Sequence, residues 1–472
     1  MPWRDLLRSS GWMLALVFAT YVVAWALLLP AVQSCFSADS ECGGNVYRSL
    51  YPLQAFLQTG RLLEYADSTT PYTTHPIGYS IVLAATFWIS ESQPLLPIVV
   101  LQLLLLFACG IAVAVILSPL GRGPALTGLA LTVFNPNAWF VAVQPRTDMV
   151  FGACLAVTLL TAFSYLGRPR LATAVICGIS LGLATMVRPV SEHLIYTLPI
   201  AFVLLGLLAD NRRRPLLALR DGAMAGAVGL ALILPWFLHM TANGQGWSLT
   251  GWDIRSQWIR DIHATLEFTK RRDAPLSTIL LSGYESARRK DMKNEYDRLH
   301  SARIAAATAG WHNLSRTQQQ KLIAEDRYHQ VKQYGLSTHV AAALQNWKWT
   351  LLSGGEGELF KALGKEDEID NLPQDAPLFF WTVKSLFIGF SLSLKALALL
   401  GVVGCIVHRR YGVLLLSLIP IVYMMAAHAY YGGPRYRLPI EPCFVILAVF
   451  GLEYLRRPWA YVLKHRRFVS AA

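Results

Sequence analysis

The sequence predicts an all-α integral membrane protein with about ten transmembrane helices, on the basis of its composition and its apolar runs. Hydrophobic residues make up 54% of the 472 residues and charged residues only 15%, against about 45–50% and about 25% in soluble proteins. Apolar runs of about 20 residues, long enough to cross a bilayer as a helix, recur along the chain. This pattern excludes a soluble enzyme, a disordered chain and a fibrous repeat, and seven cysteines are too few for a disulfide scaffold.

Ten runs are long and apolar enough to span a membrane: 11–30, 94–119, 124–142, 148–167, 171–187, 190–209, 218–239, 381–407, 411–430 and 438–456. The first run follows a short basic start and has no small-residue cleavage site after it. We therefore expect a retained helix there rather than a signal peptide.

The net charge of +13 is explained by membrane topology. Basic clusters such as Arg212 to Arg214 lie between apolar runs, whereas the polar segment 241–378 holds both signs in nearly equal numbers. Because Lys and Arg are enriched in cytoplasmic loops, ten spans with both termini in the cytoplasm place every basic cluster inside. A nucleic-acid-binding protein would concentrate positive charge on its soluble part, so we expect no nucleic-acid partner.

This topology divides the chain into three parts. Residues 1–239 hold seven spans and a large outer loop at 31–93, residues 240–380 form a small helical outer domain, and residues 381–472 hold three spans and a basic cytoplasmic tail. Within the outer loop, 47–60 and 78–90 are too short to span and are expected as interfacial helices. Cys35 and Cys42 fall on the oxidising side and can form a local disulfide.

Charged side chains at the membrane are candidate functional residues, because a charge at mid-bilayer costs about 2.5–3.5 kcal/mol. Arginine forks bind phosphate through paired hydrogen bonds, and a carboxylate can take a proton from an attacking hydroxyl. Acids and arginines at one membrane surface therefore suit an anionic, lipid-linked substrate. The candidates all fall at the outer surface, opposite the basic loops: His75, Asp148, Arg188, Glu192, Arg435, Arg437 and Glu441.

Each candidate also has a structural explanation. Asp148 suits the first turn of a helix, where the helix dipole favours an acid. The arginines can anchor at lipid headgroups. Glu192 can simply pair with Arg188, and His75 can be a polar loop residue.

Five motifs lie in order along the chain. They are His75-Pro76-Ile77-Gly78-Tyr79 opening an interfacial helix, Asp148 at the start of the fourth span, Arg188-Pro189 after the fifth, Pro235-Trp236 ending the seventh, and Arg435-Tyr436 through Pro439 before the last. In this order they resemble the GT-C superfamily of membrane glycosyltransferases, and more narrowly its bacterial protein-mannosyltransferase and aminoarabinose-transferase branch. No single motif is specific, but together they cover nearly the whole chain and imply a GT-C-like fold.

The sequence departs from this family in its first outer loop. The expected position of an acid, near Asn45 to Tyr47, holds none, and the nearest acids are Asp39 and Glu41. A moved acid is the favoured interpretation, with Asp39 slightly ahead of Glu41. An inactive relative and a different use of Asp148 remain open. Arg48 is a further candidate for binding phosphate.

The resemblance implies an inverting glycosyltransferase of the bacterial inner membrane with a periplasmic active site. A polyprenyl-phosphate-linked sugar is the expected donor, and the acceptor is an envelope lipid, polysaccharide or protein. No cofactor is expected, and metal dependence stays open. The implied catalytic residues are Asp39 or Glu41 together with Asp148, and the implied substrate-binding residues are Arg48, His75, Tyr79, Arg188, Glu192, Arg435, Tyr436 and Arg437.

Three other functions remain open. A lipid-linked oligosaccharide ligase or polymerase would use similar arginines. A transporter or flippase would show internal repeats and ionisable groups at mid-bilayer, and we find no repeat and expect the charges at one surface. A non-catalytic lipid-handling partner would fit the displaced first-loop acid.

Overall fold

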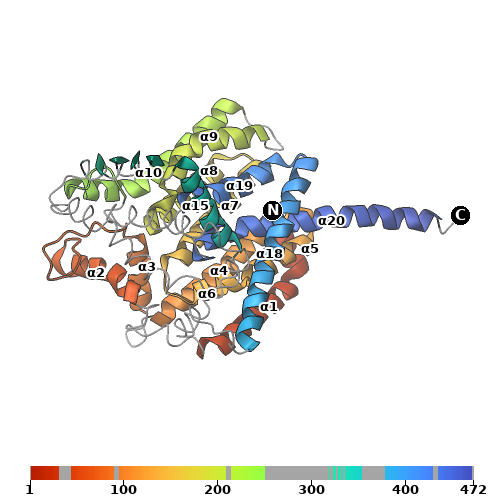
Figure 1. Ribbon diagram of the computed structural model, residues 1–472, viewed down its shortest axis with the longest axis horizontal. Helices are drawn as coiled ribbons and strands as arrows, with labels where there is room; N and C mark the ends of the chain where they lie inside the picture. The colour runs from red at the N-terminus through yellow and green to blue at the C-terminus, as the bar shows by residue number, and fades with distance from the viewer. Residues whose placement is uncertain are drawn as a thin grey trace.

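The computed structural model of the protein describes residues 2–30, 44–89, 95–208, 214–249, 335–352, 378–428 and 434–469, with scattered helical residues between 318 and 332. Within these ranges the regular structure is helical, apart from one isolated β-bridge between Leu63 and Pro71 (Figure 1). The expected all-α class is therefore confirmed.

Seven of the described helical segments are long and apolar enough to cross a membrane. The protein is thus an all-helical membrane protein. The segments are formed by α1 (Pro2–Leu28), α4 (Leu95–Leu117) with η2 (Ser118–Leu120), α7 (Thr147–Gly167), η3 (Pro189–Ser191) with α9 (Glu192–Leu208), α10 (Pro215–Ala242), α18 (Leu378–Val407), and η5 (Pro434–Ile440) with α20 (Glu441–Val469).

The remaining expected spans are shorter. Helices α8 (Leu171–Val187) and α19 (Tyr411–Ala427) are apolar but only 17 residues long. The expected single helix at 124–142 is wrong, because the chain forms α5 (Arg122–Val133) and α6 (Pro136–Ala142) instead. Pro136 has no backbone N–H and disfavours a continuous helix. The side-chain oxygen of Asn135 starts the second helix by accepting hydrogen bonds from the backbone N–H groups of Asn137 and Ala138, at 3.0 and 3.4 Å.

The broken pair α5 and α6 still carries the chain across the bundle. Near the start of α4, the Gln102 side chain donates a 3.2 Å hydrogen bond to the carbonyl of Arg146, directly before α7. Helices α4 and α7 therefore begin at the same end of the bundle, and the segment between them must return the chain.

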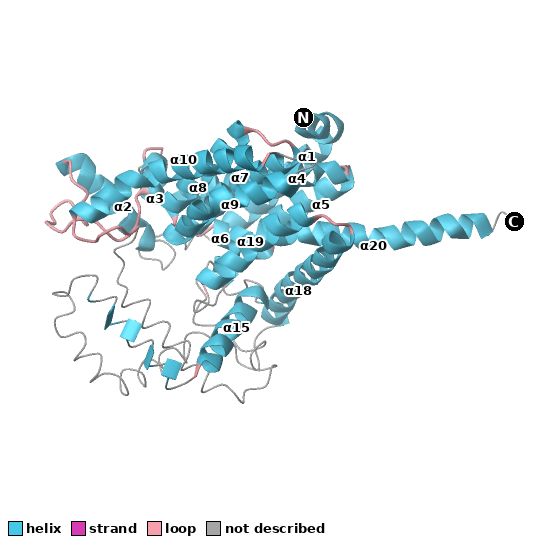
Figure 2. Ribbon diagram, turned by 90° about the horizontal axis from the view of Figure 1, so that it is seen from above, coloured by secondary structure: helices cyan, strands magenta, loops and turns pink. Residues whose placement is uncertain are grey.

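The two ends of the bundle carry different features. Helices α2 (Gly44–Thr59) and α3 (Gly78–Phe87) lie at one end, and the last part of α20 projects from the other (Figures 1 and 2). These helices occupy the places where short helices are expected in the first outer loop. We call the end that carries α2 and α3 the α3 end.

Glycines let the long helices pack with their backbones in contact, as is common between membrane helices. A Cβ atom on Gly178 of α8 would overlap the carbonyl oxygen of Ala225 in α10. A Cβ atom on Gly401 of α18 would likewise overlap the carbonyl oxygen of Leu447 in α20. The second contact brings the polar residues of α18 within reach of α20.

Helix α15 (Leu336–Leu352) belongs to the segment expected as an outer domain, and it contacts η5 and α18 (Figure 2). Most of that segment lies outside the described residues, as do Cys35, Asp39, Glu41 and Cys42.

Candidate functional site

Polar residues from four distant parts of the chain, near positions 75, 148, 188 and 428–436, meet at the α3 end. His75 lies just before α3, Asp148 lies in the first turn of α7, and Arg188 ends α8. His428 ends α19, and Arg435 and Tyr436 belong to η5. We call these six residues the Asp148 cluster. Each lies at or near a helix end, where backbone groups and charged side chains interact favourably.

An ion pair between Asp148 and Arg188 lies at the centre of the cluster. Nη1 of Arg188 donates to Oδ1 of Asp148, whose side chain is 4% exposed, against 19% for Arg188. The other carboxylate oxygen, Oδ2, accepts no hydrogen bond from the described residues. Asp148 thus stabilises the first turn of α7, as its structural explanation predicts, and it also has one oxygen that can bind a ligand.

Tyr436 brings a second arginine to the same place. Nη2 of Arg435 donates a 2.6 Å hydrogen bond to the Tyr436 hydroxyl, and Cζ of Arg435 lies 4.7 Å from the ring centroid. Cζ of Arg188 lies 5.4 Å from the centroid of the same ring. An aromatic ring beside a guanidinium group stabilises it and helps to hold it in place.

The charges around Asp148 favour an anionic ligand. Arg146, Arg188 and Arg435 all act electrostatically on the Asp148 carboxylate. Among the described residues, three guanidinium groups therefore act on this one carboxylate. Arginine binds phosphate through paired, charge-assisted hydrogen bonds, so this group of arginines suits a phosphate ligand.

A glycine places His75 in this cluster. A Cβ atom on Gly78 would lie 2.6 Å from the carbonyl oxygen of Met186, so only glycine allows α3 to begin against the last turn of α8. His75 then lies close enough to Arg188 for burial and that positive charge to lower its pKa to about 4. The imidazole is consequently neutral at pH 7. Tyr79, which follows Gly78, is 4% exposed, and its hydroxyl lies near Asp148 and Gln102.

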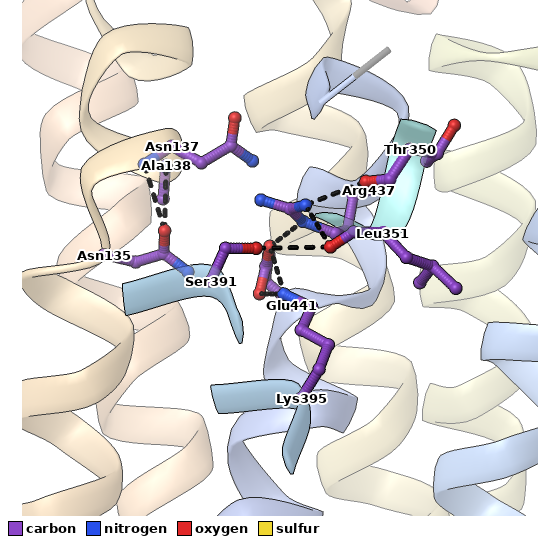
Figure 3. Close-up of polar contacts among 9 residues, drawn as sticks. All are labelled: Asn135, Asn137, Ala138, Thr350, Leu351, Ser391, Lys395, Arg437 and Glu441. Atoms are coloured by element: carbon purple, nitrogen blue, oxygen red, sulfur yellow. Dashed lines mark hydrogen bonds and ion pairs between the residues drawn. The ribbon is translucent and has the colours of Figure 1, made fainter. Parts of the chain in front are cut away.

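Arg437 lies in a separate, buried network rather than in the cluster. It is 1% exposed, pairs with Glu441, and donates from Nη1 to the carbonyls of Thr350 at 2.8 Å and Leu351 at 2.9 Å (Figure 3). Nζ of Lys395 lies 3.3 Å from both oxygens of Glu441. A 3₁₀ helix turns about 120° per residue, so residues 435 and 437 of η5 face different sides. Arg435 and Arg437 were expected to bind the substrate together, but the structure places only Arg435 in the Asp148 cluster.

Glu192 does not pair with Arg188. It accepts a 3.0 Å hydrogen bond from the Tyr196 hydroxyl one turn along α9, while Arg188 pairs with Asp148. Of the other expected residues, Asp39 and Glu41 lie outside the described residues. Arg48 lies on α2, but its side chain is also outside them.

Some buried charges do not follow the expectation that all of them lie at one surface. Lys395 is 8% exposed and lies well inside the span formed by α18. Asp221 is fully buried in α10, where Oδ2 accepts a 3.0 Å hydrogen bond from Tyr165 and Oδ1 lies 3.1 Å from Nη2 of Arg220. Both stand inside apolar runs of the sequence, and that position is the signal that identifies them. His428 also lies inside an apolar run, 411–430, but the sequence does not indicate that Asp148 and Arg188 are its neighbours, because both are distant from it in the chain.

Among the residues that the structure describes, no group of three or more His, Cys, Asp or Glu side chains is placed to hold a metal ion. Comparisons of the chain with models of known protein families, with curated proteins and with solved structures found no match.

Proposed function

We propose that the protein is an inverting glycosyltransferase of the GT-C type. It transfers a sugar from a polyprenyl-phosphate donor to a hydroxyl of an envelope acceptor, at the periplasmic face of a bacterial inner membrane. The observation that carries this proposal is the meeting of Asp148 with Arg188 and Arg435 at one end of the bundle. The order of the sequence motifs supports it independently.

Arg188 and Arg435 are the proposed binding groups for the donor phosphate. Their guanidinium groups lie against one ring, that of Tyr436, at 5.4 and 4.7 Å. The bond between the anomeric carbon and the phosphate oxygen breaks during transfer, and its electron pair leaves with polyprenyl phosphate. Preorganised positive groups stabilise the charge that develops on this leaving group.

Asp148 is the proposed group that orients the acceptor. Its Oδ1 is held by Arg188, and Oδ2 is left to accept a hydrogen bond from the attacking hydroxyl. The hydroxyl oxygen attacks the anomeric carbon on the face opposite the phosphate, so the configuration inverts. Holding both reactants in line lowers the barrier by reducing the entropy that the reaction must lose.

The proposed topology has ten crossings, with both termini in the cytoplasm. Helices α5 and α6 together form the third crossing, because α4 and α7 begin at the same end of the bundle. The segment 240–380 is the proposed periplasmic domain, and α15 is its described part.

Donor cleavage in a lipid environment tests the proposal directly. The purified protein is mixed with a panel of polyprenyl-phosphate sugars, with and without envelope acceptors, and free polyprenyl phosphate is measured by mass spectrometry. Release from one donor, dependent on the acceptor, is the expected result and identifies the sugar. Absence of release from every donor contradicts a transferase.

A flippase for polyprenyl phosphate is the second candidate. The buried charges of Lys395, Glu441 and Asp221 inside membrane helices favour it, since such groups mark transport pathways. Saturable binding of polyprenyl phosphate without release, together with its movement between leaflets of a vesicle, would support this function instead.

The first-loop acid is tested by comparing Asp39→Asn with Glu41→Gln. If one of these acids has moved into the site, one variant loses turnover and the other keeps it. Full activity in both variants removes both acids from the mechanism.

A further inference from the structure

The proposed function gives no role to His428, a polar residue of the Asp148 cluster. His428 ends α19, is 9% exposed, and lies beside η5. Its ring centroid is 4.7 Å from that of Tyr436, with the planes 30° apart. The imidazole therefore lies against the same ring as the two proposed phosphate-binding arginines.

The hydrogen bonding of His428 identifies its tautomer. Nδ1 lies 2.9 Å from the carbonyl oxygen of Met424, one turn back along α19. A carbonyl oxygen only accepts hydrogen bonds, so Nδ1 carries a proton and donates it. In the neutral ring, Nε2 then presents a lone pair. Nε2 has no hydrogen-bond partner among the described residues.

The groups that face His428 favour a neutral ring before the reaction. Arg188 at the end of α8 and Arg435 on η5 act on it with positive charge, and Asp148 at the start of α7 acts with negative charge. Among the described residues, Tyr436 is a further titratable neighbour, in ring contact. Burial of the ring opposes a positive charge on the imidazole, and two guanidinium groups against one carboxylate oppose it further.

We propose that Nε2 of His428 is the proton acceptor for the attacking hydroxyl, which makes His428 a catalytic residue of the transfer. This inference rests on the proposed glycosyltransferase function. Two residues then have separate roles. Asp148, with one oxygen already bound to Arg188, orients the acceptor, and His428 removes the proton of the acceptor hydroxyl. General bases of this kind are most often histidines.

The step balances in atoms and charge. The acceptor oxygen forms its bond to the anomeric carbon, and its proton moves to Nε2. The carbon–oxygen bond to the phosphate breaks, and the electron pair leaves with polyprenyl phosphate. The imidazolium then gives its proton to water or to the released phosphate. The nearby Asp148 carboxylate stabilises the imidazolium while it exists.

The test compares His428→Gln with a matched control, His239→Gln. A glutamine at position 428 keeps a polar amide that can reach the Met424 carbonyl, but it cannot accept the proton. The control removes another partly buried histidine near the same end, whose Nε2 is already engaged 2.8 Å from the carbonyl oxygen of Tyr72. For both variants and the unmodified protein, kcat, donor KM and the pH dependence of kcat are measured in lipid.

The expected result for His428→Gln is a fall in kcat of at least about 100-fold with an unchanged donor KM. The decline of kcat at acidic pH, where a base is protonated, also disappears. His239→Gln keeps both the rate and this acidic limb. Normal turnover with an unchanged pH profile in His428→Gln overturns the role of His428 and leaves the transferase standing. Absence of turnover in the unmodified protein with every donor overturns both.

A second measurement tests the geometry without activity. Nitrogen-15 NMR of histidine-labelled protein, with the signal assigned by its loss in His428→Gln, distinguishes a protonated Nδ1 from a protonated Nε2. An unprotonated Nε2 at pH 7 supports the proposal. A protonated Nε2 contradicts it, since no lone pair would then be available.

Discussion

The ion pair between Asp148 and Arg188 shows how a buried charge is tolerated at the α3 end. A carboxylate that is 4% exposed would be costly alone, and Arg188 and the start of α7 compensate its charge. Removing one partner from such a pair costs more than the pair itself contributes, because the other charge is left buried.

Asp148→Asn is therefore expected to lower both turnover and stability. It abolishes sugar transfer and reduces the free energy of unfolding by about 3–5 kcal/mol, the usual cost of leaving a buried charge unpaired. Glu453→Gln is the matched control, because it neutralises the carboxylate of an exposed pair with Arg456 and should cost under about 1 kcal/mol. Activity assays and thermal unfolding in detergent measure the two effects. Unchanged turnover would remove Asp148 from the mechanism.

His75 makes stability depend on pH. Its pKa is lowered from the ordinary value of 6.5 to about 4 in the folded protein. Between these values the unfolded chain binds a proton that the folded protein does not, so stability is full above pH 6.5 and falls as the pH drops towards 4. His75→Gln is expected to lose less stability between pH 7 and pH 5 than the unmodified protein does. Unfolding temperatures at the two pH values test this, and identical losses would contradict the burial of His75.

At the scale of elements, Arg437 joins three helical segments. It lies on η5, pairs with Glu441 of α20, and donates to two carbonyls in the last turn of α15. These carbonyls have no partner within their own helix and lie at the negative end of its dipole. Ser391 of α18 adds a 3.2 Å hydrogen bond to the Leu351 carbonyl.

Loss of Arg437 is expected to release α15. Arg437→Ala leaves the two carbonyls unbonded, so amides of 336–352 exchange hydrogen faster, while those of α8 do not change. Arg437→Lys keeps the charge but not the fork of donors, and exchange in α15 should be intermediate. Arg456→Ala, which removes a 66% exposed arginine, is the control. Equal exchange in all variants would show that Arg437 does not dock α15.

At the scale of the whole molecule, the two ends of the bundle differ in chemistry. The α3 end carries the Asp148 cluster, and the basic C-terminal part of α20 projects from the opposite end (Figures 1 and 2). Positive charge is retained on the cytoplasmic side of a membrane. The proposed orientation therefore puts the cluster outside the cytoplasm.

Reporter fusions test this orientation. Alkaline phosphatase, which is active only outside the cytoplasm, should be active when fused after Leu249. A fluorescent protein that folds only in the cytoplasm should fluoresce when fused after Ala472. The opposite pattern would invert the topology and place the Asp148 cluster on the cytoplasmic side.

Much of the fold is predictable from hydropathy, and the one helix that hydropathy predicts wrongly has a clear physical cause. Seven of the apolar runs are helices long enough to span, because an apolar run of that length satisfies its backbone only as a helix in a bilayer. The expectation of one helix at 124–142 is wrong because hydropathy does not detect the helix start that Asn135 and Pro136 produce inside the run. Capping depends on single residues, which an average over the run removes.

The candidate site was only partly predictable. The sequence places His75, Asp148, Arg188 and Arg435 at helix ends on one face, and the structure brings them together. The sequence does not reveal that Arg188 pairs with Asp148 rather than with Glu192. Nor does it reveal that Arg437 faces α15 and Lys395 rather than the cluster.

The membrane class, the helical content and the separation of charges along the chain thus follow from local composition, because the transfer of each segment into lipid depends mainly on its own residues. The partners of each charged group do not follow from composition. They depend on the side of each helix that packs against its neighbour, and on glycines such as Gly78 that set how closely two backbones approach. Because many of those contacts join residues on different helices, such as Asp148 of α7 and Arg188 of α8, the ion pairs and the neighbours of His428 become visible when the helices are assembled.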